Sequence, residues 1–298
     1  MAGGTTLPRR ALGRRMRELR AAAQKSQLAA GLAIEVSKQG IGRLEEGQVV
    51  RISTAQFRDL LDFYSADEDT KAEVLGLIQE IRAAKKDTTT GWWRAYDDVV
   101  KPHFDHFMSL EQACSRMTSF QLTLLPGLLQ TAAYRRWIMN TADPDISAEE
   151  SERHLELLAS RQRKLSEGTD FMLELLLSES SLRHQVGGGE VMIEQLDHLS
   201  EAGSRPNLSV RAIPFGAGAH PGLLIQSFTL FEFPELSSGR ILEPPVVFVD
   251  GFTGALFIED DVLIDRYSSA VQTLRQVALS EDDTRCLLRQ IAEEHASD

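Results

Sequence analysis

Side chains that can hydrogen-bond to bases and phosphates are concentrated in residues 26–47, which read SQLAAGLAIEVSKQGIGRLEEG. Arg43 and Gln39 have the paired groups that suit bidentate bonds to guanine and adenine edges. Lys38 adds a charged donor and Ser37 a hydroxyl. Together these residues predict contact with double-stranded DNA.

Two short helices joined by a tight turn would position these side chains. In that arrangement the second helix lies in the major groove while the first crosses the DNA backbone. Small residues are required where the helices meet, and Ala30 and Gly31 satisfy this requirement. Apolar residues are required beside the turn and inside the second helix, and these are Ile34, Val36, Ile41 and Leu44. The spacing therefore predicts a helix-turn-helix.

The charge of the chain is divided in a way that suits DNA binding by its first part alone. The chain has 298 residues and a formal net charge of −12. Residues 1–51 hold ten basic and four acidic side chains, a formal charge of +6, so the remainder carries −18. A basic head can contact phosphates while DNA repels the acidic body. The charge distribution alone does not exclude the alternative that these basic residues only increase solubility.

Helical periodicity predicts an all-α domain around this motif. Ser26, Ser37 and Ser53 are placed to cap helices, and Gly47 is placed to end one in a left-handed conformation. Five helices are predicted: four at about Leu12–Ala23, Ser26–Ala33, Ser37–Glu46 and Ser53–Tyr64, and a fifth that begins at Asp67 or Asp69 and runs to about Lys86. We therefore predict a DNA-binding domain over residues 1–86.

Residues 12–63 resemble the helix-turn-helix of the phage-repressor family, also called the Cro/cI or XRE type. The resemblance is densest from Ser26-Gln27 to the run RLEEG at residues 43–47. It implies that Gln27 holds a phosphate, that the first residues of the second helix read bases, and that a later turn of that helix also reaches DNA. The predicted DNA-binding residues are Gln27, Ser37, Lys38, Gln39, Arg43 and Arg51.

The segment departs from that family at several positions. Glu35 stands where the turn usually has glycine, and Gly31 where alanine is usual. Gly40 and Gly42 lie inside the recognition helix, and each costs up to ~1 kcal/mol relative to alanine. These glycines predict a softer recognition helix than usual.

The remainder of the chain predicts a larger α+β domain over residues 87–298, after a polar boundary at Lys85–Gly91. Residues 87–169 are predicted to be mainly helical, and residues 170–298 to form a mixed sheet flanked by helices. The predicted strands are Phe171–Leu177, Leu208–Pro214, Gln226–Phe233, Val246–Val249 and Gly254–Ile258. Helices are predicted at about 190–202, 260–279 and 281–295.

Several motifs of this half resemble the large C-terminal domain of actinomycete helix-turn-helix regulators, a domain of unknown function. They are WWRAYDDVV from Trp92, LTLLPGLLQTAAY ending at Tyr134, IPFGAGAHPGL from Ile213 and VFVDGFTGALFIED from Val247. The resemblance implies a regulator that is often encoded beside a small partner protein. It supplies no ligand and no catalytic residues.

Candidate ligand- or partner-binding residues in this half are Trp92, Trp93, Gln130 and His220. The tryptophans and the turn around Gln130 offer surface for a cavity or a dimer contact, but core packing is the favoured explanation for each of them. The histidine lies among small residues at 216–222. It could line a pocket, or the segment could be a hairpin-like connection in which the histidine caps a backbone group.

Other chemistry finds little support in the sequence. The cysteines, Cys114 and Cys286, lie far apart and are predicted to be buried thiols that form neither a disulfide nor a metal site. No secretory signal and no apolar run of about 20 residues is present, so a cytoplasmic protein without membrane contact is expected. No catalytic residues, cofactor or metal are predicted, and we do not expect an enzyme.

These observations predict a DNA-binding transcriptional regulator that acts as a homodimer on an operator. Its C-terminal domain is expected to sense either a small-molecule effector or a protein partner. One alternative is a regulatory interaction protein, similar to an antitoxin or anti-regulator, that binds mainly a small protein partner and DNA only weakly. A third hypothesis is an enzyme with its site in the loop around His220, localised by the head.

Overall fold

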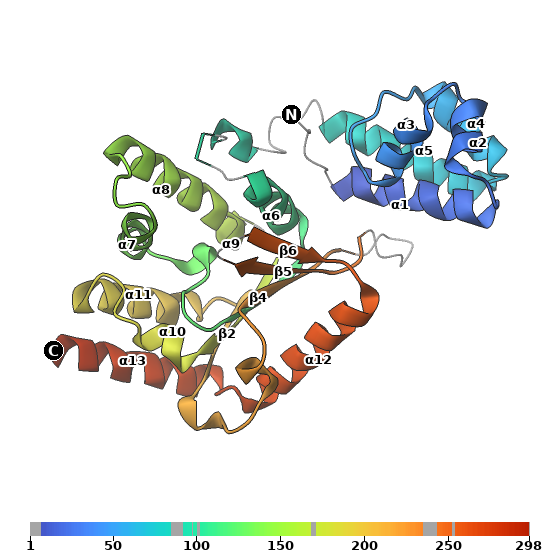
Figure 1. Ribbon diagram of the computed structural model, residues 1–298. Helices are drawn as coiled ribbons and strands as arrows, with labels where there is room; N and C mark the ends of the chain where they lie inside the picture. Colours follow the sequence, from blue (N-terminus) through green and yellow to red (C-terminus); the bar gives the residue numbers. More distant parts are fainter. Residues whose placement is uncertain are drawn as a thin grey trace. The chain divides into compact units, whose positions relative to one another are not determined.

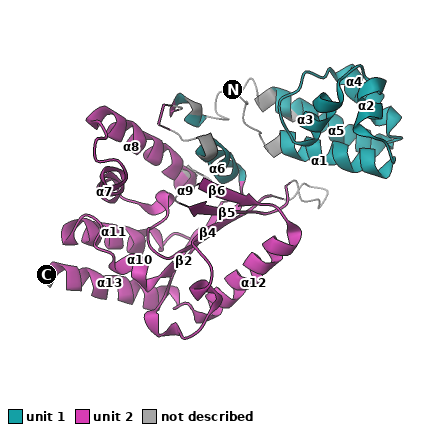
Figure 2. Cartoon of the chain, viewed as in Figure 1, with its two compact units in different colours: residues 1–95, 104–113 teal, residues 96–103, 114–298 magenta. Residues whose placement is uncertain are grey.

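The computed structural model describes residues 7–84, 92–96, 98–99, 102–167, 171–234, 243–251 and 254–297. The chain divides into two compact units (Figure 2). Unit 1 comprises residues 1–95 and 104–113, and unit 2 comprises residues 96–103 and 114–298. The predicted boundary segment, Lys85–Gly91, lies outside the described residues.

Unit 1 begins with the five helices that the sequence predicts. They are α1 (Leu7–Ala22), α2 (Gln27–Ala33), α3 (Lys38–Glu45), α4 (Thr54–Phe63) and α5 (Glu68–Ala84). A short 3₁₀ helix η1 (Trp92–Tyr96) and helix α6 (Pro102–Ala113) follow along the chain. Helix α1 starts earlier than the predicted Leu12, since a proline is well tolerated in the first turn of a helix.

Side-chain caps fix the ends of these helices. The hydroxyl oxygens of Ser26, Ser37 and Ser53 each accept a bond from the backbone N–H three residues later, at 3.1, 3.0 and 3.2 Å. Gly47 ends α3 with a φ of +71° and donates its N–H to the carbonyl of Leu44. The four predicted caps are confirmed.

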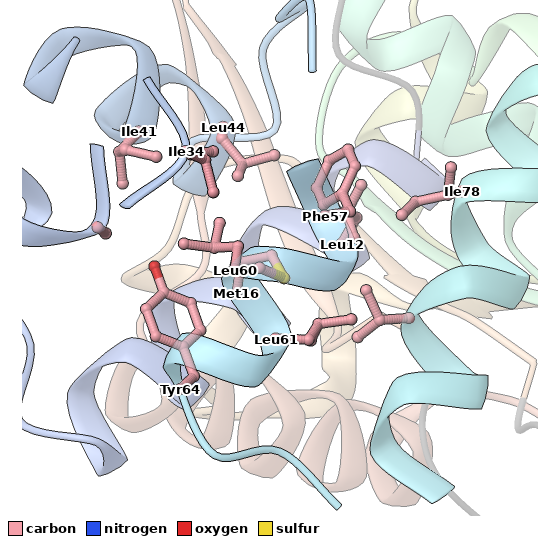
Figure 3. Close-up of a cluster of buried hydrophobic side chains, with 12 residues drawn as sticks. Leu12, Met16, Ile34, Ile41, Leu44, Phe57, Leu60, Leu61, Tyr64 and Ile78 are labelled. Carbon is pink, nitrogen blue, oxygen red and sulfur yellow. The ribbon is translucent and has the colours of Figure 1, made fainter. Parts of the chain in front are cut away.

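The apolar faces of the five helices meet in one core (Figure 3). Met16 of α1, Ile41 of α3, and Leu60 and Leu61 of α4 are completely inaccessible to solvent. Each fully buried side chain of this kind stabilises the fold by roughly 1.5–3 kcal/mol. The core therefore holds the recognition helix α3 on its apolar side.

Unit 2 alternates strands and helices, as predicted for an α+β domain. Its strands are β1 (Arg116–Gln121), β2 (Met172–Ser178), β3 (Leu208–Ile213), β4 (Phe228–Glu232), β5 (Val246–Gly251) and β6 (Gly254–Ile258). Its α-helices are α7 (Ala132–Ala142), α8 (Ala148–Gln162), α9 (Lys164–Glu167), α10 (Glu179–Arg183), α11 (Gly189–Ala202), α12 (Asp261–Val277) and α13 (Glu281–Ser297). Short 3₁₀ helices are η2 (Gly127–Leu129), η3 (Phe215–Ala217) and η4 (Pro221–Leu223).

The described strands form one mixed sheet in the order β3-β2-β1-β4-β5-β6. Strands β1, β2 and β3 are parallel to one another, whereas β4, β5 and β6 pair in antiparallel fashion. The crossover from β1 to β2 carries α7, α8 and α9, and the crossover from β2 to β3 carries α10 and α11 (Figure 1). The predicted fold class is confirmed.

Strand β1 was not predicted, because residues 87–169 carry no obvious strand pattern. Thr118 and Ser119 occupy positions in β1 that are completely buried. Their hydroxyls find partners on the neighbouring strands: Thr118 donates to Glu174 at 3.2 Å, and Ser119 lies 3.4 Å from the Thr229 hydroxyl. Buried hydroxyls in a central strand conceal the apolar pattern that predicts strands.

One face of the sheet is covered by helix α12. Phe120 of β1 pairs with Leu176 of β2 and Phe228 of β4, and these side chains share a buried cluster with Val271 and Leu274 of α12. Helices α11 and α13 pack together (Figure 1), and α13 also packs on β3. Within the described residues, no helix has the length and apolar character that a membrane span requires.

Candidate nucleic-acid interface

Helix α3 has one buried face and one face free for recognition. Ile41 is fully buried and Leu44 is 3% exposed. Lys38, Gln39 and Arg43 are exposed, and no side chain in the described residues bonds or ion-pairs with theirs. Three uncommitted polar groups therefore project from a helix that the core holds in place. Such groups can pair with base edges in a major groove.

The turn between α2 and α3 explains two departures from the family pattern. Glu35 adopts the left-handed conformation, with a φ of +58°, at the position where glycine is usual. A Cβ at Gly31 would lie 2.3 Å from the Val36 carbonyl oxygen, so only glycine allows this approach. The Val36 N–H also donates to the Gly31 carbonyl at 2.8 Å. The tight turn therefore depends on Gly31 and tolerates strain at Glu35.

The two glycines of the recognition helix have different environments. A Cβ at Gly40 would lie 2.5 Å from a methyl group of Val36, so this glycine lets the turn pack against α3. A Cβ at Gly42 would meet nothing closer than 3.9 Å, where the amide of Gln27 lies. The helix is continuous through both positions. Close packing therefore accounts for the glycine at position 40 but not for the one at position 42.

Glu45 is the polar centre of the helix-turn-helix, and its side chain is only 1% exposed. Its Oε1 accepts a bond from Nε of Arg20 at 2.5 Å, and its Oε2 accepts one from a terminal nitrogen of the same guanidinium at 3.0 Å. The Nε2 of Gln27 donates to Oε2 at 2.9 Å, and Arg17 donates to the Glu45 carbonyl at 3.1 Å. These bonds tie α1, α2 and the end of α3 together.

The hydrogen bonds with Glu45 raise the pKa of Arg20, so its guanidinium stays charged. Burial, followed by the negative charge of Glu45, raises the pKa of Tyr64. Charge-assisted bidentate bonds are among the strongest in proteins. The network therefore fixes the position of the Gln27 side chain, which was predicted to hold a phosphate.

Glu45 was not among the predicted site residues, although its position in the sequence suggests a buried carboxylate. It follows the buried Leu44 directly and stands on the inward side of an amphipathic helix, where a carboxylate must find a partner. The partner Arg20 lies 25 residues earlier, and no local spacing indicates that pairing.

The remaining predicted DNA-binding residues are Ser37, at the start of α3, and Arg51, in the connection that follows it. The Ser37 hydroxyl is engaged as the cap of α3 and remains at the surface. Arg51 is exposed in the connection between α3 and α4. It lines a groove of about 240 Å³ together with apolar side chains such as Val50 and Ile52.

The predicted tryptophan pair lies in unit 1 and is largely structural. The rings of Trp92 and Trp93 pack edge to face with centroids 6.0 Å apart. The indole N–H of Trp93 donates to Asp105 at 2.5 Å, and that of Trp92 to Gln112 at 3.4 Å. Trp93 is 6% exposed, so core packing accounts for it.

Gln130 lies in a turn that glutamine side chains hold together in unit 2. The side-chain Nε2 of Gln130 donates to the Leu125 backbone carbonyl at 2.7 Å. The backbone carbonyl of Gln130 accepts a bond from the side chain of Gln162 at 2.8 Å. The fully buried Gln195 of α11 donates to the Leu129 carbonyl and accepts the Thr131 N–H, at 2.7 and 2.8 Å. The motif LLPGLLQT is therefore a clamped turn.

His220 lies in the connection from β3 to β4, which is not the predicted hairpin because β2 and β1 separate those strands in the sheet. Its Nδ1 is buried without a hydrogen-bond partner, so the predicted backbone cap is wrong. A Cβ at Gly222 would lie 2.8 Å from this nitrogen, which explains the glycine. No described contact joins His220 to Gln130.

The described residues contain no group of three or more His, Cys, Asp or Glu side chains able to hold a metal ion. Both cysteines are free. Cys114 is buried as predicted, but Cys286 is exposed, because it lies on the outer face of α13.

Comparison with known families finds two family models that match separate segments of the chain. A model described as a helix-turn-helix domain matches residues 11–74, and a model described as a domain of unknown function, DUF5753, matches residues 104–290. Neither a curated protein nor a solved structure matches the chain. The helix-turn-helix match supports a DNA-binding role for the first domain.

Proposed function

The chain belongs to the family defined by the domain of unknown function DUF5753, and we propose that it is a sequence-specific transcriptional regulator. In this proposal the head is of the Cro/cI (XRE) type, as in the actinomycete regulators that the sequence resembles. The body is an effector domain without enzymatic activity. The regulator acts in the cytoplasm on an operator near the gene it controls.

The observation that carries the proposal is the recognition helix. Its exposed face offers Lys38, Gln39 and Arg43, while Glu45 and the apolar core fix its position. A pre-positioned helix loses little conformational entropy on binding, which favours affinity. The formal charge of +6 on residues 1–51 adds attraction to phosphates.

We infer that the regulator binds DNA as a homodimer. One recognition helix reaches only a few base pairs, which gives too little discrimination among genomic sites. Two heads joined by their bodies would read two half-sites about one helical turn apart. An effector or a protein partner of the body would then act by changing how the two heads are held.

The test is binding to an operator selected from a randomised DNA pool with the full-length protein. The double variant Lys38→Ala/Arg43→Ala is compared with Arg58→Ala, which removes an exposed charge on α4. Each lost base contact costs about 1–3 kcal/mol, so the double variant should bind the operator at least roughly tenfold more weakly. The Arg58→Ala control should lose far less.

If the wild type and the double variant bind the operator with equal affinity, α3 is not the helix that contacts the bases. A failure to select any preferred sequence would favour the alternative, in which the chain regulates mainly by binding a small protein partner.

A further inference from the structure

A groove of about 240 Å³ lies on unit 1, lined by α1, α5 and the connection from α3 to α4, and we call it the head groove. Its lining includes Leu12 of α1, Leu44 of α3, Phe57 of α4 and Ile78 of α5. These four side chains belong to the buried core of the five helices and are only 3–5% exposed (Figure 3). The floor of the head groove is therefore the outer surface of that core.

The side chains around this floor are also apolar. Val50, Ile52 and Ile81 are half-buried and pack against the core. Val49, which lines the same groove, is 45% exposed. Apolar surface that is concave and partly open to solvent is typical of sites that bind a partner. A molecule that fills the head groove must therefore offer apolar groups.

The rim of the head groove is positively charged. Arg51, in the connection from α3 to α4, and Arg82 of α5 both line it and are exposed. No side chain in the described parts of the chain bonds or ion-pairs with either guanidinium. Arg9 and Gln48 complete the polar lining, and no described acidic side chain lines the groove. Electrostatic complementarity therefore favours an occupant with negative charge beside its apolar groups.

The size and chemistry of the head groove select among anionic occupants. Its volume lies below the range of about 300–1,000 Å³ that is typical of small-molecule pockets, so it suits a few side chains inserted by a larger partner. The phosphates of DNA could pair with Arg51 and Arg82 but would leave the apolar floor uncovered. A protein segment with large apolar side chains next to carboxylates matches both the floor and the rim.

We propose that the head groove binds an acidic, amphipathic segment of a partner protein. Apolar side chains of the segment enter between Val49 and Ile81, and its carboxylates pair with Arg51 and Arg82. The exposed side chains of α3 that we propose read bases do not line this groove. The inference therefore goes beyond the proposed function and does not depend on it.

The first test uses short synthetic peptides in which a pair of large apolar residues lies between glutamates. They are compared with the same peptides carrying glutamine or lysine in place of glutamate, and binding to the full-length protein is followed by fluorescence anisotropy. The glutamate peptides should bind most tightly, and their affinity should fall as salt rises because exposed charges are screened.

Variants of the full-length protein then locate the site. Val49→Glu places an acid in the apolar wall and should abolish binding of the best glutamate peptide. The matched control Leu32→Glu changes a 74% exposed leucine of α2 outside the groove, and should bind this peptide as the wild type does. Arg51→Glu and Arg82→Glu, tested singly, should each weaken binding roughly threefold or more. Arg58→Glu makes the same change of charge on α4, outside the groove, and should have little effect.

Three results would overturn the proposal. One is equal or weaker binding of the glutamate peptides compared with the glutamine or lysine peptides. Another is equal binding by Val49→Glu and Leu32→Glu, with unfolding temperatures showing that both variants are folded. The third is weaker binding in the arginine variants alone, which would mean that the rim attracts anions in general, DNA phosphates included. No measurement uses DNA, so the proposed function is tested separately.

Discussion

The turn before the recognition helix contains a residue whose replacement should stabilise the protein. Glu35 is exposed and has a φ of +58°, a conformation in which the Cβ of an L-residue crowds the following carbonyl. Glycine has no Cβ and adopts this conformation freely. We therefore predict that Glu35→Gly stabilises the helix-turn-helix domain without altering its contacts.

The magnitude follows from two opposing effects. Relief of the left-handed strain contributes about 1–2 kcal/mol. The greater freedom of glycine in the unfolded chain offsets about 0.4–1 kcal/mol of this gain. The net stabilisation is about 0.5–1 kcal/mol, which corresponds to a rise of roughly 2–8 °C in the unfolding temperature of a domain of this size.

Hydrogen exchange of peptides that cover residues 27–46, together with calorimetric unfolding, provides the assay. Exchange of this segment should slow in Glu35→Gly. Glu35→Gln keeps the strain and removes the charge, so its stability should stay near that of the wild type. Glu35→Asn should lie between the two, because asparagine tolerates the left-handed region. Equal stabilities of the Gly and Gln variants would refute the reasoning.

Three further predictions concern packing, a buried amide and an ion pair. Gly31→Ala should destabilise the head by about 1–3 kcal/mol in urea unfolding because its methyl group meets a backbone oxygen at 2.3 Å, whereas Gly42→Ala has room and should stabilise it by up to ~1 kcal/mol. Gln195→Leu leaves the Leu129 carbonyl and the Thr131 N–H without their side-chain partner and should lower the stability of unit 2 by about 2–4 kcal/mol in urea unfolding. Burial opposes ionisation of Glu174, but bonds from Arg275 outweigh it and hold the pKa of the carboxyl below its ordinary 4.5. Its contribution is therefore present above pH 4.5 and is lost as pH falls through the folded pKa, so unfolding of Glu174→Gln measured from pH 7 to 3 should show a weaker acid dependence.

Local signals were enough to predict the head. Serines at 26, 37 and 53 and the glycine at 47 act within one turn of chain, so their sequence positions fix the helix ends. The 3.6-residue periodicity likewise identifies the side of α3 that carries Ile41 and Leu44. The exposed face that we propose reads DNA follows from the same pattern.

Features that depend on distant partners could not be predicted. Strand β1 pairs with strands β2 and β4, and its buried Thr118 and Ser119 have their hydroxyl partners more than 50 positions away, so these two residues look like loop residues in isolation. The pairing of Glu45 with Arg20 and the clamp by Gln195 likewise need the tertiary fold. Gln130 was identified as a candidate through its motif, and its environment became defined only in three dimensions.

The measurement that tests the central proposal most directly is a salt titration of DNA binding. The full-length protein is titrated with its selected operator and with a scrambled DNA of equal length, at several salt concentrations. Our account predicts tighter binding to the operator at every salt concentration, with an affinity that falls steeply as salt rises because phosphate contacts release counterions. Equal binding to both DNAs at low salt would contradict it.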